Sequence, residues 1–183
     1  MNLEAQLRDL ITRDPVRMHI LRTVSDLNLP DSWVAAGFVR SLVWDHLHQR
    51  NPSPLPDDVD VVWFDENRSS AQTDSALEAE LATLCSAVNW SVKNQARMHQ
   101  RNADAPYGAA ADAMTFWPET ATAVGVRLGQ NDEIEVLAPL GLEDLFALKV
   151  RPTARFENDK YAMFVERVQS KRWLEIWPKL TRG

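Results

Sequence analysis

Two aspartates separated by a single valine are the residues of this chain best suited to do chemistry. Asp58 and Asp60 open an apolar run, from Val59 to Phe64, whose β-branched residues predict a buried central strand. Side chains two residues apart on a strand point to the same face, so the two carboxylates should lie side by side. Paired carboxylate oxygens are the ligands that a hard cation such as Mg²⁺ prefers. The pair therefore predicts a metal site.

A glycine upstream of this pair marks the point where a strand should turn into a helix. The apolar run at residues 33–36 has the boundaries of a short strand, and Gly37 follows it. From Phe38 onward the apolar residues have helical spacing, at Val39, Leu42, Val43 and Leu47. The N-terminus of a helix offers free backbone N–H groups to an anion. If a phosphate approaches the backbone at Gly37, the glycine and the aspartates together would form a metal–triphosphate site.

Composition limits the classes of protein and partner. A chain of 183 residues, 45% of them hydrophobic, suits one packed domain. The formal net charge of −6 provides no general positive field for a nucleic acid, which argues against a nucleic-acid partner. Cys85 is the only cysteine and lies in a helical apolar stripe, so we expect a buried thiol and no cysteine-rich zinc site.

The chain shows no targeting or membrane signal. Its first residues lack a basic region followed by an apolar block, so no signal peptide is predicted. No run approaches the roughly 20 apolar residues that a membrane span requires. The sequence therefore predicts a cytoplasmic protein with no membrane partner, and leaves its oligomeric state open.

Helices and strands alternate along the chain, which we expect to form one domain over residues 1–183. It would comprise N-terminal helices (1–30), a core (31–151) and a C-terminal helical extension (152–183). Residues 120–128 and 133–138 read as two strands joined in a hairpin, so the sheet should be mixed and contain antiparallel pairs. The predicted fold class is accordingly α+β (mixed α/β), flanked by helices at both ends.

A polar face is predicted beside the paired acids. Residues 90–99 alternate between apolar and polar side chains, which is typical of a half-buried strand. Lys93, Arg97 and His99 would share its polar face, where they would either bind substrate or face solvent. Asp45, in the helix after Gly37, reads as a helix-surface acid, with a place in the lining of the site as the alternative.

The segments Gly37-Phe38-Val39-Arg40 and Asp58-Val59-Asp60-Val61 resemble the nucleotidyltransferases of the DNA polymerase β superfamily. Members carry a glycine-containing turn that opens a helix, followed by a strand with two acids. Outside the site the chain is similar to a bacterial branch known as nucleotidyltransferase family proteins. That similarity lies in residues 43–45, 94–99, 117–124 and 138–146 and covers nearly the whole chain.

The resemblance implies a polymerase β-like core and a chemistry. Two Mg²⁺ ions roughly 3.5–4 Å apart, held by Asp58 and Asp60, would clamp the attacking and leaving oxygens of a phosphoryl displacement. Gly37 and Phe38 would bind the triphosphate of an NTP, and Arg40 would neutralise the leaving pyrophosphate. A nucleoside monophosphate would then pass to a hydroxyl of a small molecule or a protein.

The sequence leaves the third metal-binding carboxylate of the superfamily unassigned. The strand expected to carry it offers no acid, and the remaining candidates are Asp112 and Glu135. Two functions follow. A third acid near Asp58 and Asp60 favours a Mg²⁺-dependent transferase, whereas basic or amide neighbours favour a nucleotide-binding or interaction module that keeps the fold without turnover.

Overall fold

The computed structural model describes residues 2–183 and is built around a mixed five-stranded sheet of order β3-β2-β1-β4-β5. The strands are β1 (Trp33–Ala35), β2 (Val59–Trp63), β3 (Trp90–Asn94), β4 (Gly125–Leu128) and β5 (Ile134–Leu137). Strand β2 runs parallel to β3, whereas the pairs β1–β2, β1–β4 and β4–β5 are antiparallel. The predicted α+β class, the mixed sheet and the hairpin are therefore confirmed. The first hairpin strand is shorter than predicted, because residues Thr120–Thr122 form a 3-10 helix and β4 begins at Gly125.

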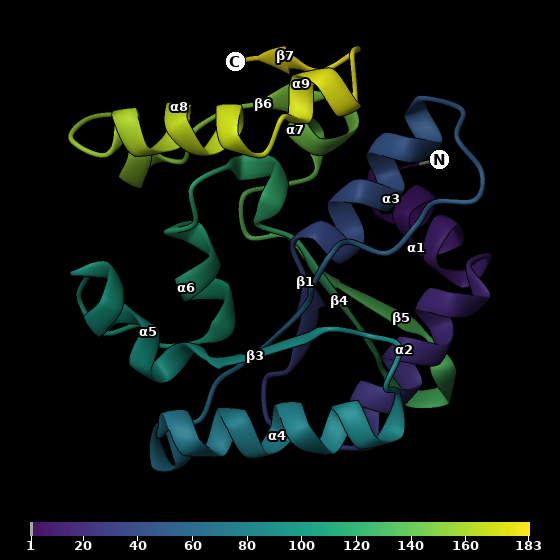
Figure 1. Ribbon diagram of the computed structural model, residues 1–183, viewed down its shortest axis with the longest axis vertical. Helices are drawn as coiled ribbons and strands as arrows, with labels where there is room; N and C mark the ends of the chain where they lie inside the picture. Colours follow the sequence, from purple (N-terminus) through teal and green to yellow (C-terminus); the bar gives the residue numbers. More distant parts are fainter. Residues whose placement is uncertain (1) are drawn as a thin grey trace.

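Helices cover the sheet and both ends of the chain (Figure 1). The longer ones are α1 (Leu3–Thr12), α2 (Pro15–Ser25), α3 (Gly37–Leu47), α4 (Ala71–Leu84), α5 (Gln95–Asn102) and α8 (Tyr161–Ser170). Shorter ones are α6 (Ala110–Thr115), α7 (Glu143–Phe146) and α9 (Trp173–Ile176), and β6 (Lys149–Val150) pairs with β7 (Thr181–Arg182). None of the helices within residues 2–183 is long and apolar enough to cross a bilayer.

The strand predicted over residues 90–99 is wrong in its second half. Strand β3 ends at Asn94, and the next residue begins α5. The Asn94 side chain accepts a hydrogen bond from the Ala96 N–H at 3.0 Å and donates to the Asp65 carbonyl at 2.8 Å. An asparagine in this position is a helix N-cap, so the polar alternation beyond it belongs to a helix.

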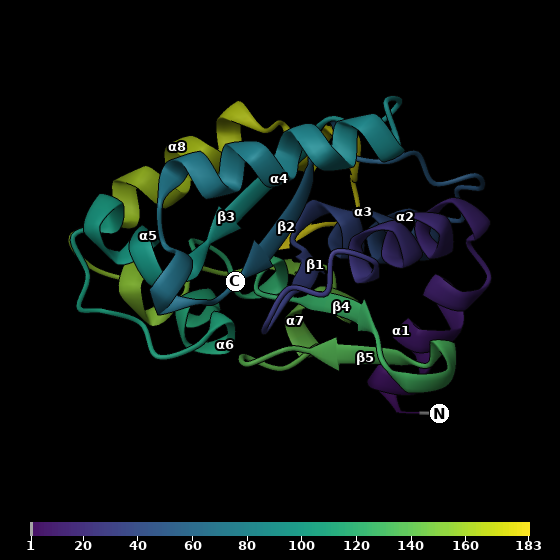
Figure 2. The same cartoon turned by 90° about the horizontal axis from the view of Figure 1, so that it is seen from below.

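The two faces of the sheet are covered differently. Strand residues such as Val34, Val61 and Val126 belong to the main core, where α1 to α4 pack against the sheet. On the opposite face a smaller cluster joins Trp33, Ala35, Val62 and Ala110 of α6, with Phe64, Trp117 and Leu137 packed against it. Helices α4 and α6 accordingly lie on opposite sides of the sheet (Figure 2). Asp60 alternates with Val61 and pairs with Ala35, so it belongs to the α6 face.

Three tryptophans attach the C-terminal helices to α3. Trp44 is fully buried, and its ring meets those of Trp173 and Trp177 edge-on, at centroid distances of 5.7 and 5.1 Å. Such contacts contribute beyond the burial of their area. The C-terminal segment therefore packs against the helix that Gly37 begins, at the end of the molecule far from α4 (Figure 1).

Asp45 was predicted on the surface but is 4% exposed. Its carboxylate accepts hydrogen bonds from Trp177 Nε1 at 2.8 Å and from Ser53 Oγ at 2.7 Å. One side chain thus joins α3 to the segment after α9 and to the proline-rich loop at residues 51–57. The sequence prediction was wrong because Trp177 lies far from Asp45 in the chain and Ser53 reaches it only through the path of the loop.

Asp45→Ala is expected to lower the free energy of unfolding by roughly 2–4 kcal/mol, because it leaves the buried Trp177 Nε1 and the partly buried Ser53 hydroxyl without their acceptor. Urea denaturation measures the change. Asp26→Ala, at an exposed position, is the matched control and should change stability by less than about 0.5 kcal/mol. Equal effects of the two substitutions would contradict the linking role of Asp45.

Candidate active site

Four of the residues assigned to the site from the sequence line a single cavity of about 620 Å³, together with the buried Asp45. They are Gly37, Arg40, Asp58 and Asp60. The cavity lies between the β1–α3 turn, the proline-rich loop, the start of β2 and the C-terminal helices. The Phe38 side chain is elsewhere: it is fully buried, and the Arg17 guanidinium lies 5.5 Å from its ring centroid. Any contact of Phe38 with a ligand would therefore be through its backbone.

The two aspartates differ in exposure and repel each other. Asp58 is exposed in the bend just before β2, while Asp60 is the second residue of the strand and is half-buried. Burial, and after it the charge of Asp58, raises the pKa of Asp60 to about 6, against the opposing effects of the Ser91 side chain and Arg40. A cation bound between the carboxylates would relieve this repulsion.

The turn into α3 is shaped for close approach to its backbone. Ala36 has φ 55° and ψ −121°, a conformation that costs a residue with a side chain of order 1–3 kcal/mol. A Cβ at Gly37 would lie only 3.2 Å from Pro56 Cβ and 3.4 Å from Arg40 Nη2. No side chain caps the helix, so its first N–H groups remain available to an anion.

Arg40 is a largely buried cation held between two indole rings. It is 7% exposed, and its guanidinium carbon lies 5.2 Å from the Trp44 centroid and 4.3 Å from that of Trp173. Nη1 donates to Thr122 Oγ1 at 3.1 Å, while the buried Nε has no hydrogen-bond partner. Burial lowers its pKa to about 10, against the opposing charge of Glu119, so it remains a cation at neutral pH.

Helix α8 and the residue that follows it contribute two further cations that sequence reasoning missed. Arg167 and Lys171 line the cavity. Arg167 Nε donates to Glu119 Oε1 at 2.7 Å, and Glu119 is 1% exposed with its other oxygen unpaired. The spacing of Arg167 and Lys171 (i, i+4) places them on one helical face. Only the packing of α8 reveals that this face is turned toward Gly37 and the aspartates.

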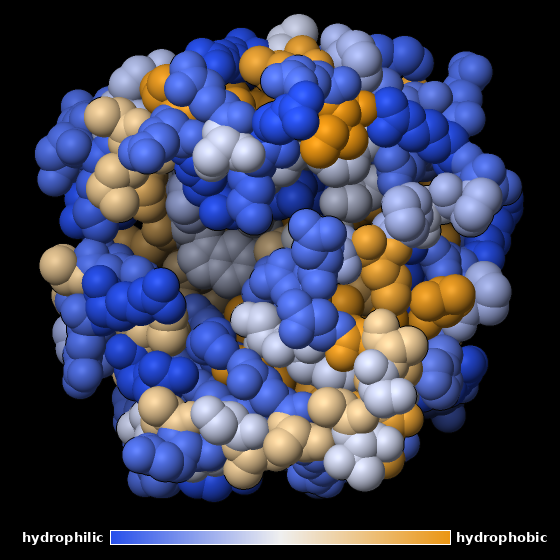
Figure 3. All heavy atoms as spheres, in the orientation of Figure 1, coloured by the Kyte–Doolittle hydropathy of each residue, from blue (hydrophilic) through white to orange (hydrophobic). Residues whose placement is uncertain are grey.

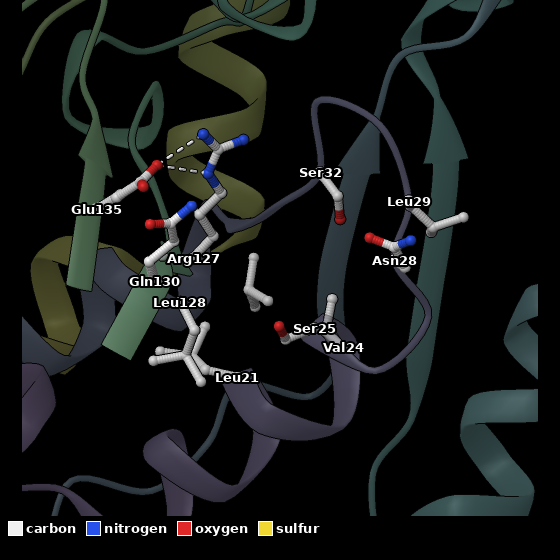
Figure 4. Close-up of a pocket in the computed structure, with 12 residues that line it drawn as sticks. Leu21, Val24, Ser25, Asn28, Leu29, Ser32, Arg127, Leu128, Gln130 and Glu135 are labelled. Atoms are coloured by element: carbon white, nitrogen blue, oxygen red, sulfur yellow. Dashed lines mark hydrogen bonds and ion pairs between the residues drawn. The ribbon is translucent and has the colours of Figure 1, made fainter. Parts of the chain in front are cut away.

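Neither candidate for the third acid lines the cavity that contains Asp58 and Asp60. Asp112 is exposed on α6, and its carboxylate accepts a hydrogen bond from the Gly108 N–H at 2.9 Å. Glu135 lies on β5, three strands from β2, which corresponds to about 14 Å of sheet. It accepts a hydrogen bond from Arg127 Nε at 2.7 Å, beside a different pocket (Figure 4). Within residues 2–183 no group of three or more His, Cys, Asp or Glu side chains is arranged to hold a metal.

The three residues of the predicted polar face contact other parts of the protein and not the cavity. Lys93 Nζ donates to Glu78 at 2.7 Å, and Arg97 pairs with Asp74, both acids belonging to α4. The His99 ring packs edge-on against Tyr107 at a centroid distance of 6.1 Å. None of Lys93, Arg97 and His99 lines the cavity that contains Asp58 and Asp60.

Comparison with known proteins identifies the family. A family model described as nucleotidyltransferase matches residues 22–182. The chain belongs to this nucleotidyltransferase family. One solved structure, described as an NMR structure that reveals a CCA-adding enzyme head domain, is 36% identical with a TM-score of 0.85, over 98% of this chain and 95% of that one. No curated protein is similar enough to be matched to this chain.

Larger enzymes share the fold of this nucleotidyltransferase. A Thermotoga maritima CCA-adding enzyme complexed with tRNA matches with a TM-score of 0.58 at 15% identity, over 97% of this chain and 42% of that one. A CCA-adding enzyme in complex with ATP matches with a TM-score of 0.56 at 16% identity, over 96% and 41%. This chain therefore spans less than half the length of those two enzymes, and the likeness to them concerns the fold.

Asp60→Asn is expected to stabilise the metal-free nucleotidyltransferase at pH 7 by about 1–2 kcal/mol. The pKa of Asp60 is about 6 in the folded protein, against about 4 for an unfolded aspartate, so the folded state binds this proton more tightly. The free energy of unfolding of the wild type should therefore rise, relative to that of the variant, as the pH falls from 7 toward 4. Urea denaturation of both proteins in EDTA, at several pH values in this range, measures the difference. Parallel pH profiles of the two proteins would contradict the raised pKa.

Proposed function

We propose that this nucleotidyltransferase depends on Mg²⁺ and moves a nucleoside monophosphate from an NTP to a hydroxyl of a small molecule or a protein. The observation that carries the proposal is the shared cavity. Asp58 and Asp60 line it together with the uncapped start of α3 at Gly37 and with the buried cation Arg40. This chemistry requires a pair of acids to hold the metal, a helix end that binds an anion, and a cation.

The residues present fit Mg²⁺. Both carboxylates are hard oxygen donors, and the repulsion that helps raise the pKa of Asp60 is what a bound cation would cancel. Asp58 and Asp60 would hold the metal, which when bound would supply charge stabilisation at the reacting phosphate. The α3 N-terminus would bind the triphosphate oxygens. Arg40, with Arg167 and Lys171 in the same cavity, would offset the charge of the leaving pyrophosphate.

The acidic chain favours a small-molecule or protein acceptor over a nucleic acid, because its net charge of −6 does not attract a phosphate backbone. Structures of CCA-adding enzymes with this fold are described as complexes with CTP, ATP or tRNA, and these ligands belong to those proteins alone. They support an NTP as donor here and leave tRNA as a competing acceptor for experiment.

A second candidate function, a nucleotide-binding module without turnover, rests on the absence, in the described part of the chain, of an assigned third carboxylate beside Asp58 and Asp60. The predicted third-acid candidates, Asp112 and Glu135, are bound elsewhere, as they would be in a nucleotide-binding module without turnover. A pyrophosphate-release assay separates the two. Purified protein is incubated with Mg²⁺, each of the four NTPs, and panels of hydroxyl-bearing metabolites, peptides and RNA. Acceptor-dependent release that Asp58→Asn abolishes supports the transferase. NTP binding without release in any combination supports the module.

A further inference from the structure

A second cavity opens beside the first and shares two residues with it. It has a volume of about 830 Å³ and lies between α5, the segment after α6, and α8. The molecular surface is visibly hollowed in the region between α8 and α5 (Figures 1 and 3). Arg167 and Lys171 line both cavities, so a molecule in the second would adjoin one in the first.

The second cavity also borders the sheet face that carries Asp60. Trp117 lines it and packs against the cluster of Trp33, Ala35 and Val62. Ala35 is the cross-strand partner of Asp60. The Trp117 backbone is fixed by its neighbours, since its carbonyl accepts from Thr153 Oγ1 at 2.6 Å. One wall of the second cavity thus packs on the sheet face that carries Asp60.

The second cavity is lined mainly by positive side chains, although the chain as a whole is negatively charged. Four cations line it, against two acids: Arg101, Lys160, Arg167 and Lys171, against Asp104 and Glu166. Asp104 is already neutralised, because Arg155 Nε donates to it at 2.8 Å. The side chains of Arg101 and Lys171 have no hydrogen bond or ion pair with any residue of the described part of the chain. An anionic group entering here would find free cations.

The remaining walls are flat and apolar. Phe116, Trp117 and Phe156 contribute rings, and Met98 and Met163 contribute flexible thioethers. Lys160 Nζ lies 5.5 Å from the Phe156 centroid and donates to the Asn102 carbonyl at 2.9 Å, so it is fixed over the ring. Aromatic rings beside fixed cations favour a ligand that combines a planar ring with a negative group.

We propose that the second cavity binds the acceptor, and that the acceptor is a small phosphorylated molecule with an aromatic ring. This inference rests on the proposed nucleotidyl transfer. The acceptor's phosphate would pair with Arg101, and its ring would pack on Trp117. Its hydroxyl oxygen would bond to the α-phosphorus of the NTP in the first cavity. The bond from that phosphorus to the bridging oxygen would break, pyrophosphate would leave with the electron pair, and the hydroxyl proton would pass to water.

Calorimetry with 5′-AMP as the probe tests this site, because AMP carries both an aromatic ring and a phosphate. The full chain is first saturated with Mg²⁺ and a non-hydrolysable NTP, so that the first cavity is filled, and AMP is then titrated. One AMP is expected to bind. Arg101→Gln should weaken AMP binding about fivefold or more and leave NTP affinity within twofold, since Arg101 lines only the second cavity.

Arg172→Gln is the matched control, because Arg172 neighbours Lys171 but pairs with Glu175 and lines neither cavity. It should leave AMP binding unchanged. NTP binding without AMP binding at millimolar concentration would overturn the acceptor site alone. So would an Arg101→Gln variant that weakens NTP as much as AMP, because the cavity would then hold part of the NTP. AMP binding without NTP binding would overturn the proposed transfer and leave the cavity as an AMP site.

Discussion

Replacing Asp58 and Asp60 together by asparagine is expected to abolish Mg²⁺-dependent NTP binding and to lower nucleotidyl transfer by at least about 10³-fold. The metal supplies several kcal/mol of charge stabilisation in such reactions, and both of its proposed ligands would be gone. The fold should survive, because Asp58 is exposed and loss of the Asp60 charge relieves a repulsion. Calorimetry with Mg²⁺ and a non-hydrolysable NTP measures binding, and circular dichroism checks the fold.

The control variants are Asp112→Asn and Glu135→Gln, which remove charges at the two positions considered for a third acid. Both residues interact with groups outside the cavity of the aspartates, so transfer should stay within about threefold of wild type, as for surface substitutions of small energetic effect. A large loss of transfer in either control would indicate that the acid reaches the metal in a different conformation. Unchanged NTP binding by the double aspartate variant would contradict the metal assignment.

Arg40→Met is expected to lower nucleotidyl transfer by about 10²–10³-fold, the effect of removing one preorganised charge from a reaction centre. Methionine fills much of the space between Trp44 and Trp173, so the contact between α3 and α9 should persist. Arg40→Lys keeps the charge but loses the planar group that lies between the two rings. Its transfer activity should therefore lie between those of the wild type and Arg40→Met.

Steady-state kinetics of pyrophosphate release distinguishes two roles for Arg40. A loss in kcat larger than the rise in KM places its effect on the leaving pyrophosphate, as proposed. Equal activity of Arg40→Met and wild type would show that this buried cation serves packing alone. Thermal unfolding of each variant separates a lost charge from a lost fold.

The residues near the strand-to-helix turn could be predicted because their signals are local. Gly37, the helical spacing after it, and the β-branched run beginning at Val59 fix two strands and a helix within a short stretch, and the structure brings Gly37, Arg40, Asp58 and Asp60 to one cavity. The mixed sheet was predictable for the same reason, because a hairpin imposes an antiparallel pair on its neighbours.

The remaining parts of the site depend on contacts between residues far apart in the chain. The position of Arg167 follows from tryptophan packing between α3 and the C-terminal helices, and the burial of Asp45 follows from Trp177. Neither of these contacts produces a periodic pattern in the sequence. The end of β3 was misplaced because Asn94 fits a strand alternation and a helix cap equally well, and its hydrogen bonds to the residues around Asp65 favour the cap.

The most direct test of the central claim is a crystal structure of the protein with Mg²⁺ and a non-hydrolysable NTP. The proposed function predicts metal density bound by Asp58 and Asp60, the triphosphate against the N-terminus of α3 at Gly37, and Arg40 facing its terminal phosphates. The second cavity should remain open to an acceptor. A triphosphate bound elsewhere, with both aspartates free of metal, would contradict the account.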